Sequence, residues 1–194
     1  PHDIFLDKGE DWALGFGPTL RFMAESMVLW KTLEEMLEAD LEFHLTGGLL
    51  VAGNEKEMQQ VRRKSDVEKQ FGIQAEVLDK SDLRKIAPYI SEEMVGGVFY
   101  PEEGKANPLL VTPAFAYQAE KYGVQILRNV EVQNIAIENR GFTVYTTKGE
   151  ISCERISNCA GIDAARISAM VGLELPVRGY PIQVSVTEPI APII

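Results

Sequence analysis

The sequence is poor in the residues that build metal sites and disulfide frameworks. Its 194 residues include two cysteines and two histidines. Cys153 and Cys159 are too few for a disulfide scaffold. His2 and His44 lie far apart and match no zinc-ligand spacing. We therefore expect neither a structural metal nor a disulfide framework.

Long hydrophobic runs and an excess of positive charge are also missing. No stretch approaches the ~18 apolar residues that span a bilayer, and we expect no signal peptide. Asp and Glu number 29 against 19 Lys and Arg, a formal net charge of −10 at pH 7. An acidic chain repels phosphate backbones, so we expect no nucleic-acid partner. We expect a soluble, cytoplasmic protein of helices and strands, and leave a peripheral membrane contact open.

Apolar periodicity predicts one long helix near the N-terminus. Pro18 and Thr19 punctuate its start, and its apolar residues recur at steps of three and four, which places them on one face. We expect this face to pack in the core: Leu20, Met23, Met27, Trp30, Leu33 and Leu37. A Gly47-Gly48 pair between two apolar runs, 41–46 and 49–52, then predicts a β-hairpin.

Local signals mark the next elements. Asn54 with Glu57 three residues later resembles a capping box, and Gly72 is placed to end the helix that follows. Asn107-Pro108 opens another helix, which Gly123 stops. Pro113 leaves two alternatives, a kinked helix or one that begins at 112–113. We further expect an extended piece at 75–78, a helix at 81–87 and a strand at 96–100.

The second half of the chain is rich in β signals. Turns at 139–141 and 148–149 join three of four apolar runs, which predicts an antiparallel meander. The four runs span residues 124–127, 130–137, 142–147 and 150–153. After them we expect a short strand at 155–158, a tight turn at 159–161, a helix at 163–171 and a final strand at 183–187.

No motif with a strong catalytic signature is present. The segment at 15–20, Gly-Phe-Gly-Pro-Thr-Leu, is a near miss to a dinucleotide-binding loop. Leu20 replaces the third glycine, and Pro18 has no amide to offer a phosphate, so we expect no phosphate loop here. Cys159 precedes a predicted helix start, which can lower a thiol pKa. No partner histidine is evident, and we expect Cys159 to be buried in packing.

The order and spacing of several weak motifs are more informative. The pattern runs from GGVFYPEEGKANPLLVTPAFAYQAEKYGVQI through NVEVQNIAIENRGFTVYTTKGEISCERISNCAG and ends with IDAARISAMVGLELPV and VSVTEP. It resembles the D-amino-acid oxidase superfamily of FAD-dependent oxidoreductases. Within that superfamily it is most similar to the group of glycine oxidase, sarcosine oxidase β-subunit, and hydrogen cyanide synthase or opine oxidase subunits.

The resemblance implies an α+β flavoprotein fragment. It implies part of an FAD-binding domain with a β meander and part of a mixed-sheet substrate domain. Residues 1–40 would be a helical segment of the FAD domain, and 41–105 the first part of the substrate domain. Residues 106–175 would return to the FAD domain, and 176–194 would begin a second substrate-domain segment. The family's N-terminal βαβ unit with its GxGxxG loop and its C-terminal part have no counterpart here.

The implied activity is oxidation of the C–N bond of an amine or small amino acid, of glycine, sarcosine, D-amino acid or opine type. Hydride would pass to the flavin, and the imine would hydrolyse. We expect the full-length protein to be an oxidase or dehydrogenase and this chain alone to be inactive. Two alternatives stay open: a non-catalytic binding or assembly module, or a flavin hydroxylase. The resemblance also allows a partner subunit in a heteromer, and truncation could leave apolar surface that pairs two copies.

The resemblance places the cofactor contacts in the second half of the chain. A main-chain valine contact to the adenine end of FAD falls on Val132, with Val130 as the alternative register. Small residues in the turn at Cys159, Ala160 and Gly161 would let bare backbone approach the FAD. The alternative for Gly161 is a plain strand-to-helix turn. Tyr100 is a weaker candidate to line the substrate pocket, and no catalytic residue is identified.

Overall fold

The computed structural model describes residues 2–180 and 183 and divides them into two compact units. Unit 1 lies within the first 124 residues, and unit 2 begins at Gln125. The described elements combine helices with small antiparallel sheets, which confirms the predicted α+β class. The predicted strand at 183–187 lies outside the described residues apart from Gln183.

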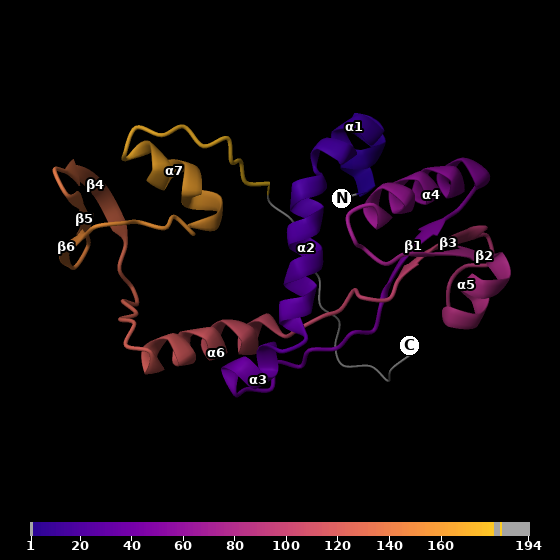
Figure 1. The fold of residues 1–194 in the computed structure, drawn as a ribbon, viewed down its shortest axis with the longest axis horizontal. Helices are drawn as coiled ribbons and strands as arrows, with labels where there is room; N and C mark the ends of the chain where they lie inside the picture. The colour runs from indigo at the N-terminus through magenta and orange to yellow at the C-terminus, as the bar shows by residue number, and fades with distance from the viewer. Residues whose placement is uncertain (1, 181–182, 184–194) are drawn as a thin grey trace. The chain divides into compact units, whose positions relative to one another are not determined.

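Three helices open unit 1. They are α1 (His2–Gly15), α2 (Gly17–Trp30) and α3 (Leu33–Leu37) (Figure 1). The prediction of one continuous helix through residue 37 is wrong, because the backbone turns at Lys31 and Thr32. The predicted core face is only partly buried. Its two ends, Leu20 and Leu37, are buried, whereas Met23 is 54% exposed.

The sheet of unit 1 has three antiparallel strands in the order β1-β3-β2. They are β1 (Gly48–Ala52), β2 (Glu76–Asp79) and the central β3 (Gly96–Tyr100). The predicted hairpin at 41–52 is therefore wrong: β1 pairs with β3, and His44 forms an isolated bridge with Lys105 instead. Gly47 does adopt the positive φ, 78°, that the glycine pair had indicated.

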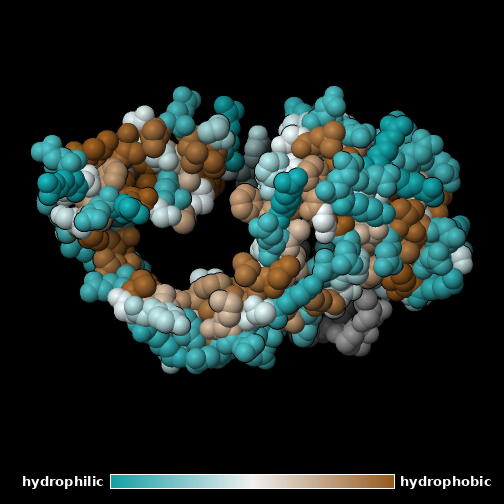
Figure 2. Space-filling model, viewed as in Figure 1, coloured by the Kyte–Doolittle hydropathy of each residue, from teal (hydrophilic) through white to brown (hydrophobic). Residues whose placement is uncertain are grey.

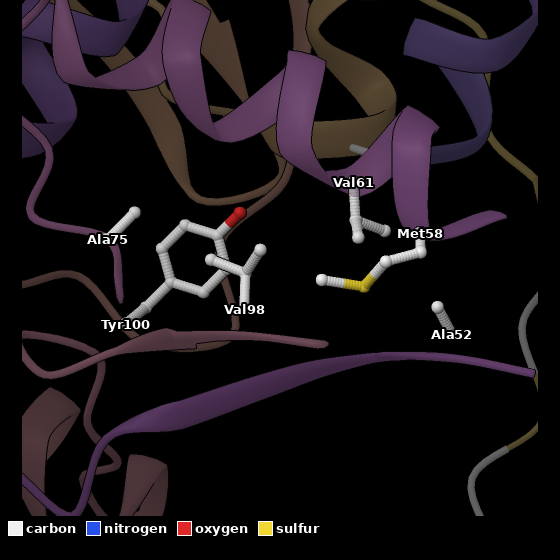
Figure 3. Packing of buried hydrophobic residues seen from close by; sticks show 6 residues of the cluster. All are labelled: Ala52, Met58, Val61, Ala75, Val98 and Tyr100. Carbon is white, nitrogen blue, oxygen red and sulfur yellow. The ribbon is translucent and has the colours of Figure 1, made fainter. Parts of the chain in front are cut away.

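Two helices cover the opposite faces of this sheet. Side chains alternate along a strand, so Val98 and Tyr100 face α4 (Glu55–Lys69), whereas Phe99 packs with the cluster of α5 (Lys80–Ile86). Figure 3 shows the α4 side, where Met58 and Val61 descend onto Val98, Tyr100 and Ala52. The result is a helix–sheet–helix sandwich within unit 1.

The ends of α4 confirm the local sequence signals. The Asn54 Oδ1 accepts a 3.0 Å hydrogen bond from the Glu57 amide. The Glu57 carboxylate reaches back to the Gly53 amide at 2.7 Å, which completes a variant of the capping box. At the other end Gly72 has φ 91°, a left-handed value that suits glycine.

The helix α6 (Pro108–Lys121) is the last element of unit 1 and packs on α3. Asn107 caps it, and Pro113 lies inside it, so the start at 108 holds rather than the start at 112–113. The buried Gln118 donates a 2.8 Å hydrogen bond to the Leu37 carbonyl. Lys121 pairs with Glu38 at 2.9 Å, so α6 is fixed to the end of α3 at two points.

Unit 2 contains the predicted meander. Its strands are β4 (Val132–Glu138), β5 (Gly141–Thr146) and β6 (Gly149–Cys153), in the order β4-β5-β6. The predicted strands at 124–127 and 155–158 are wrong, because both segments are irregular. The predicted helix at 163–171 is shorter and comprises a 3₁₀ turn, η1 (Gly161–Asp163), followed by α7 (Ala164–Ala169).

Both units expose large apolar side chains. On α2, Phe22 is 72% exposed, and on α6, Leu109 is 81% exposed. Figure 2 shows apolar atoms gathered along one side of α6. In unit 2, Ile162 and Leu173 are also exposed. Such faces are ordinarily covered by further structure or by a partner. Among the described helices, none has the length and apolar character to cross a bilayer.

Candidate functional site

The start of β4 is irregular at the residue singled out from the sequence. Val132 pairs with Thr146 and Asn134 with Tyr145, so β4 advances two residues while β5 advances one. Gln133 is thus the extra residue of a β-bulge. A bulge interrupts the ladder and redirects the backbone, which makes this stretch of main chain available to a ligand. Val130, the alternative position, precedes β4 and lies outside the ladder.

The backbone leading into Val132 is held by local hydrogen bonds. Glu131 and Thr147 exchange two of them: the Thr147 amide donates to the Glu131 carbonyl at 3.0 Å, and the Glu131 amide donates to the Thr147 hydroxyl at 3.1 Å. Asn129 has φ 55°, a left-handed value that asparagine tolerates well. The turn before Val132 is therefore fixed, although it is exposed at the surface.

Asn158 organises the turn at 159–161. Its Nδ2 donates to the Ala164 carbonyl at 2.9 Å and to the Ser168 hydroxyl at 3.0 Å. Its Oδ1 accepts from the Ala160 amide at 3.2 Å. One amide side chain thus joins the turn to α7 through both of its polar atoms. Sequence reasoning noted Asn158 as part of the motif and assigned it no role.

Gly161 begins η1 with φ 55°. A Cβ added here would meet no atom of the described residues within 4 Å. Glycine is therefore favoured at this position by its positive φ and not by crowding. Ala160 is exposed beside it. Open space beside two side-chain-poor residues is the arrangement that lets a flat ligand lie against main chain.

Arg166 connects this turn with the bulge. Its Nε donates to the Asp163 carboxylate at 3.2 Å, and its Nη1 donates to the Val132 carbonyl at 3.5 Å. The contact joins two residues of unit 2 that are 34 positions apart in the sequence, and it places α7, the helix that follows the predicted turn, beside the bulge at Val132. Sequence reasoning missed Arg166, since an arginine on a short helix gives no signal of a contact so distant along the chain.

Cys159 differs from its prediction. We expected it to be buried, and it is exposed. Its Sγ lies 3.6 Å from the Ser157 hydroxyl. Within the described residues no group of three or more His, Cys, Asp or Glu side chains could hold a metal ion.

Tyr100 belongs to unit 1 and lies in its core. The side chain packs with Met58 and Val98 under α4 (Figure 3). Its hydroxyl donates a 2.8 Å hydrogen bond to Glu68 and accepts one from Lys64 at 3.3 Å. Burial, and then the adjacent Glu68 charge, raise the pKa of Tyr100 well above its usual value. The phenol therefore stays neutral, and its role in a substrate pocket remains a prediction.

The near-miss glycine segment at 15–20 lies at the junction of α1 and α2. No strand precedes it among the described residues, and a Cβ on Gly17 would collide with the Phe71 ring. Gly17 thus packs directly against the Phe71 side chain. This geometry agrees with the expectation that the segment is not a phosphate-binding loop.

The site in unit 2 fits a nucleotide cofactor better than an acid–base centre. Peptide N–H and C=O groups recognise the edge of a heterocycle, and glycine and alanine permit close approach. The bulge at Val132 and the open turn at Ala160 and Gly161 offer such main chain. These residues are compatible with part of an FAD site, and the phosphate-binding loop of that site has no counterpart among them.

Comparison with known proteins gives relatives in one enzyme family. The chain is 28% identical to sarcosine oxidase subunit beta of Arthrobacter sp over 176 residues, which are 87% of this chain and 44% of that protein. It is 33% identical to an Escherichia coli L-2-hydroxyglutarate dehydrogenase (strain UMN026) over 139 residues, 69% of this chain and 32% of that protein.

Among solved structures, glycine oxidase from Bacillus cereus ATCC 14579 superposes with a TM-score of 0.65 at 27% identity. The match covers 80% of this chain and 42% of that one. The chain thus spans less than half the length of each of these proteins. Residues 7–193 match the model of the DAO family, described as FAD dependent oxidoreductase. The chain therefore belongs to the DAO family of FAD-dependent oxidoreductases.

Proposed function

We propose that this chain is the interior part of an enzyme that uses FAD to oxidise the C–N bond of a small amine or amino acid. The observation that carries the proposal is the contact between the Val132 bulge and the 158–166 segment in a chain of this family. The substrate class rests on the relatives, which include a sarcosine oxidase subunit and a glycine oxidase.

FAD, when bound, would supply the electron acceptor for this oxidation. In our proposal the main chain of Val132 receives the adenine end, with Val130 as the alternative. The turn at Cys159, Ala160 and Gly161 lies against the cofactor with little side chain in between. Asn158 holds that turn in place through its three hydrogen bonds. These residues bind and orient the cofactor, and none of them needs to move a proton.

The domain boundaries are part of the proposal. We assign residues 1–40 and 106–175 to the FAD domain, and 41–105 and 176–194 to the substrate domain. The packing of α6 on α3 supports joining 1–40 with the first part of 106–175, because Gln118 and Lys121 bind the end of α3 directly. The sandwich of β1–β3 with α4 and α5, built from residues 48–100, has an apolar cluster on each face of its sheet, which supports assigning it to a substrate domain.

A second candidate is oxidation of the C–OH bond of a hydroxy acid. It is favoured by the 33% identity to an L-2-hydroxyglutarate dehydrogenase. The cofactor contacts would be the same in both cases, because both oxidations deliver two electrons to the flavin. The substrate alone distinguishes the two candidates.

The test uses the complete open reading frame that encodes these residues. The protein is purified with FAD and mixed without oxygen with sarcosine, glycine, L-proline or L-2-hydroxyglutarate. Loss of the visible flavin absorbance with one of the three amines supports the proposal. Loss with L-2-hydroxyglutarate alone replaces it by the second candidate. A yellow protein that no substrate reduces, or a colourless protein, contradicts both and favours a non-catalytic module.

Partner and location complete the proposal. One relative is the β-subunit of an oxidase, so the enzyme is proposed to work as one subunit of a heteromer. The exposed apolar faces of α2 and α6 give such contacts a surface, and they would also allow two copies of this chain to pair. A cytoplasmic location is proposed from the low cysteine content.

A further inference from the structure

The guanidinium of Arg166 lies where the adenine end of the cofactor is proposed to bind. Its Nη1 is 3.5 Å from the carbonyl oxygen of Val132. That carbonyl belongs to the residue whose main chain is proposed to meet the adenine. A ligand that uses the Val132 carbonyl therefore comes within reach of Arg166.

The side chain is held and still accessible. Its Nε donates a 3.2 Å hydrogen bond to the carboxylate of Asp163, which lies three residues before Arg166, in the 3₁₀ turn that precedes α7. The Arg166 side chain is nevertheless 47% exposed, so part of it remains accessible to a ligand. A guanidinium that is held by Asp163 and Val132 and is still partly exposed can stack on a flat ring or donate hydrogen bonds to the acceptors of that ring.

The charges around Arg166 indicate which part of the cofactor it would contact, the adenosine or the phosphates. Asp163 offsets part of the positive charge of Arg166. An arginine paired with a carboxylate attracts phosphate less strongly than a free one, while its planar face and remaining N–H groups are unaffected. The pairing therefore favours the neutral adenosine half of the cofactor over its pyrophosphate.

We propose that Arg166 contacts the adenosine half of FAD and thereby helps to determine that the protein takes FAD and not FMN. The inference rests on the proposed function, since it needs an FAD site at Val132. It adds a residue with its own test: a side chain on α7 that recognises the nucleoside, held in position by Asp163.

The experiment measures binding of FAD, ADP, adenosine and FMN to the complete reading frame. Apoprotein is titrated with each flavin by fluorescence, and ADP and adenosine compete with FAD. Arg166→Ala should weaken FAD, ADP and adenosine about tenfold each, the range of one hydrogen bond to a charged donor. FMN binding should not change. Arg166→Lys, which keeps the charge and a donor, should restore part of the loss.

The matched control is Arg140→Ala, at the β4–β5 turn. It should bind all four ligands like the wild type. Because Arg166→Ala could disturb α7, Arg166→Met is measured beside it as a variant of similar volume, and thermal melting checks the fold of each.

Three outcomes overturn the inference. A folded Arg166→Met with wild-type FAD affinity removes any role for the guanidinium. Weaker ADP with unchanged adenosine assigns Arg166 to the phosphates. An equal loss for FMN and FAD assigns it to the flavin half. A wild-type protein that binds no FAD at all is a different result, because it overturns the proposed function, and this inference with it.

Discussion

The hydroxyl of Tyr100 donates a 2.8 Å hydrogen bond to the carboxylate of Glu68. This bond fastens the end of β3 to α4 beneath a shared apolar cluster. Lys64 bonds to both partners, which makes a small polar network at the edge of the core. Tyr100, chosen from the sequence as a candidate pocket residue, thus has a clear structural task in unit 1.

Replacing Tyr100 by Phe should destabilise unit 1 by about 1.5–3 kcal/mol, the usual value of a hydrogen bond to a charged group. Urea unfolding followed by the fluorescence of Trp12 and Trp30, both in unit 1, measures the change. The control is Tyr122→Phe, which removes a hydroxyl from a side chain that is 87% exposed and should leave the free energy of unfolding unchanged. Equal stability of Tyr100→Phe and the wild type would contradict this role for the network.

The same residue predicts a pH dependence. Burial and the Glu68 charge raise the pKa of Tyr100 in the folded protein, whereas in the unfolded chain it ionises near 10. The stabilisation it gives is therefore complete below pH ~10 and falls as the pH rises above that value. The stability difference between wild type and Tyr100→Phe should be constant below pH ~10 and should shrink as the pH rises above that value. A difference independent of pH would show that the raised pKa is wrong.

The central strand should not tolerate a side chain at Gly97. A Cβ there would lie 2.6 Å from the backbone oxygen of Leu50, in the adjacent strand β1, which cannot move aside. Gly97→Ala should cost more than about 2 kcal/mol, a value typical of overpacking. Gly15→Ala is the control: it has open space at the end of α1 and should be neutral or slightly stabilising. Circular dichroism during denaturation compares the two, and equal melting would contradict the close approach.

Removing the N-terminal cap of α4 should lower stability by less than the Gly97 substitution does. Asn54→Ala removes the acceptor of the Glu57 amide and should lower stability by about 1 kcal/mol. Asn54→Asp keeps an acceptor and should restore most of it. Hydrogen exchange at the first turn of α4 reports the local change, and unaltered protection in Asn54→Ala would count against the cap.

The exposed face of α2 predicts self-association of the isolated chain. Phe22, Val28 and Leu29 are each more than half exposed. The apparent mass by light scattering should rise with concentration, and a Phe22→Gln, Leu29→Gln double variant should lower it. Glu25→Gln on the same helix is the control, because it changes no apolar area. A mass that is constant and monomeric at all concentrations would refute the prediction.

The isolated chain should also bind FAD poorly. It holds the bulge and the turn of the proposed site, and the 15–20 segment cannot replace a phosphate-binding loop. After incubation with FAD and dialysis, the 194-residue chain should retain little flavin absorbance. A stoichiometric yellow protein would mean that these residues suffice for the cofactor.

Sequence patterns predicted elements whose causes are local. The Asn54–Glu57 cap, the left-handed Gly72 and Gly123, and the short turns of the meander each depend on a few neighbouring residues. The predicted partner of β1 was wrong because Gly47-Gly48 has the composition of a hairpin turn. The observed partner, β3, is favoured by the burial of Val98 and Tyr100 under α4. Register across such a distance leaves no local trace.

The candidate site divides in the same way. Val132, Ala160 and Gly161 were reached through a family pattern, and the role of Asn158 could have been read from its position before a small-residue turn. The bulge at Gln133 and the contact of Arg166 with Val132 could not, since the first arises from the register of β4 against β5 and the second from how β4 meets α7, 34 residues later.

The middle strand of the first sheet, Gly96–Tyr100, is also the last of its three strands to be synthesised. Until it leaves the ribosome, Gly48–Ala52 and Glu76–Asp79 have no strand to pair with, and each exposes open backbone edges to other nascent chains. Because of the order of translation, the sheet can form only after these five residues have been synthesised. A polypeptide released before them would carry two unpaired strands that invite aggregation.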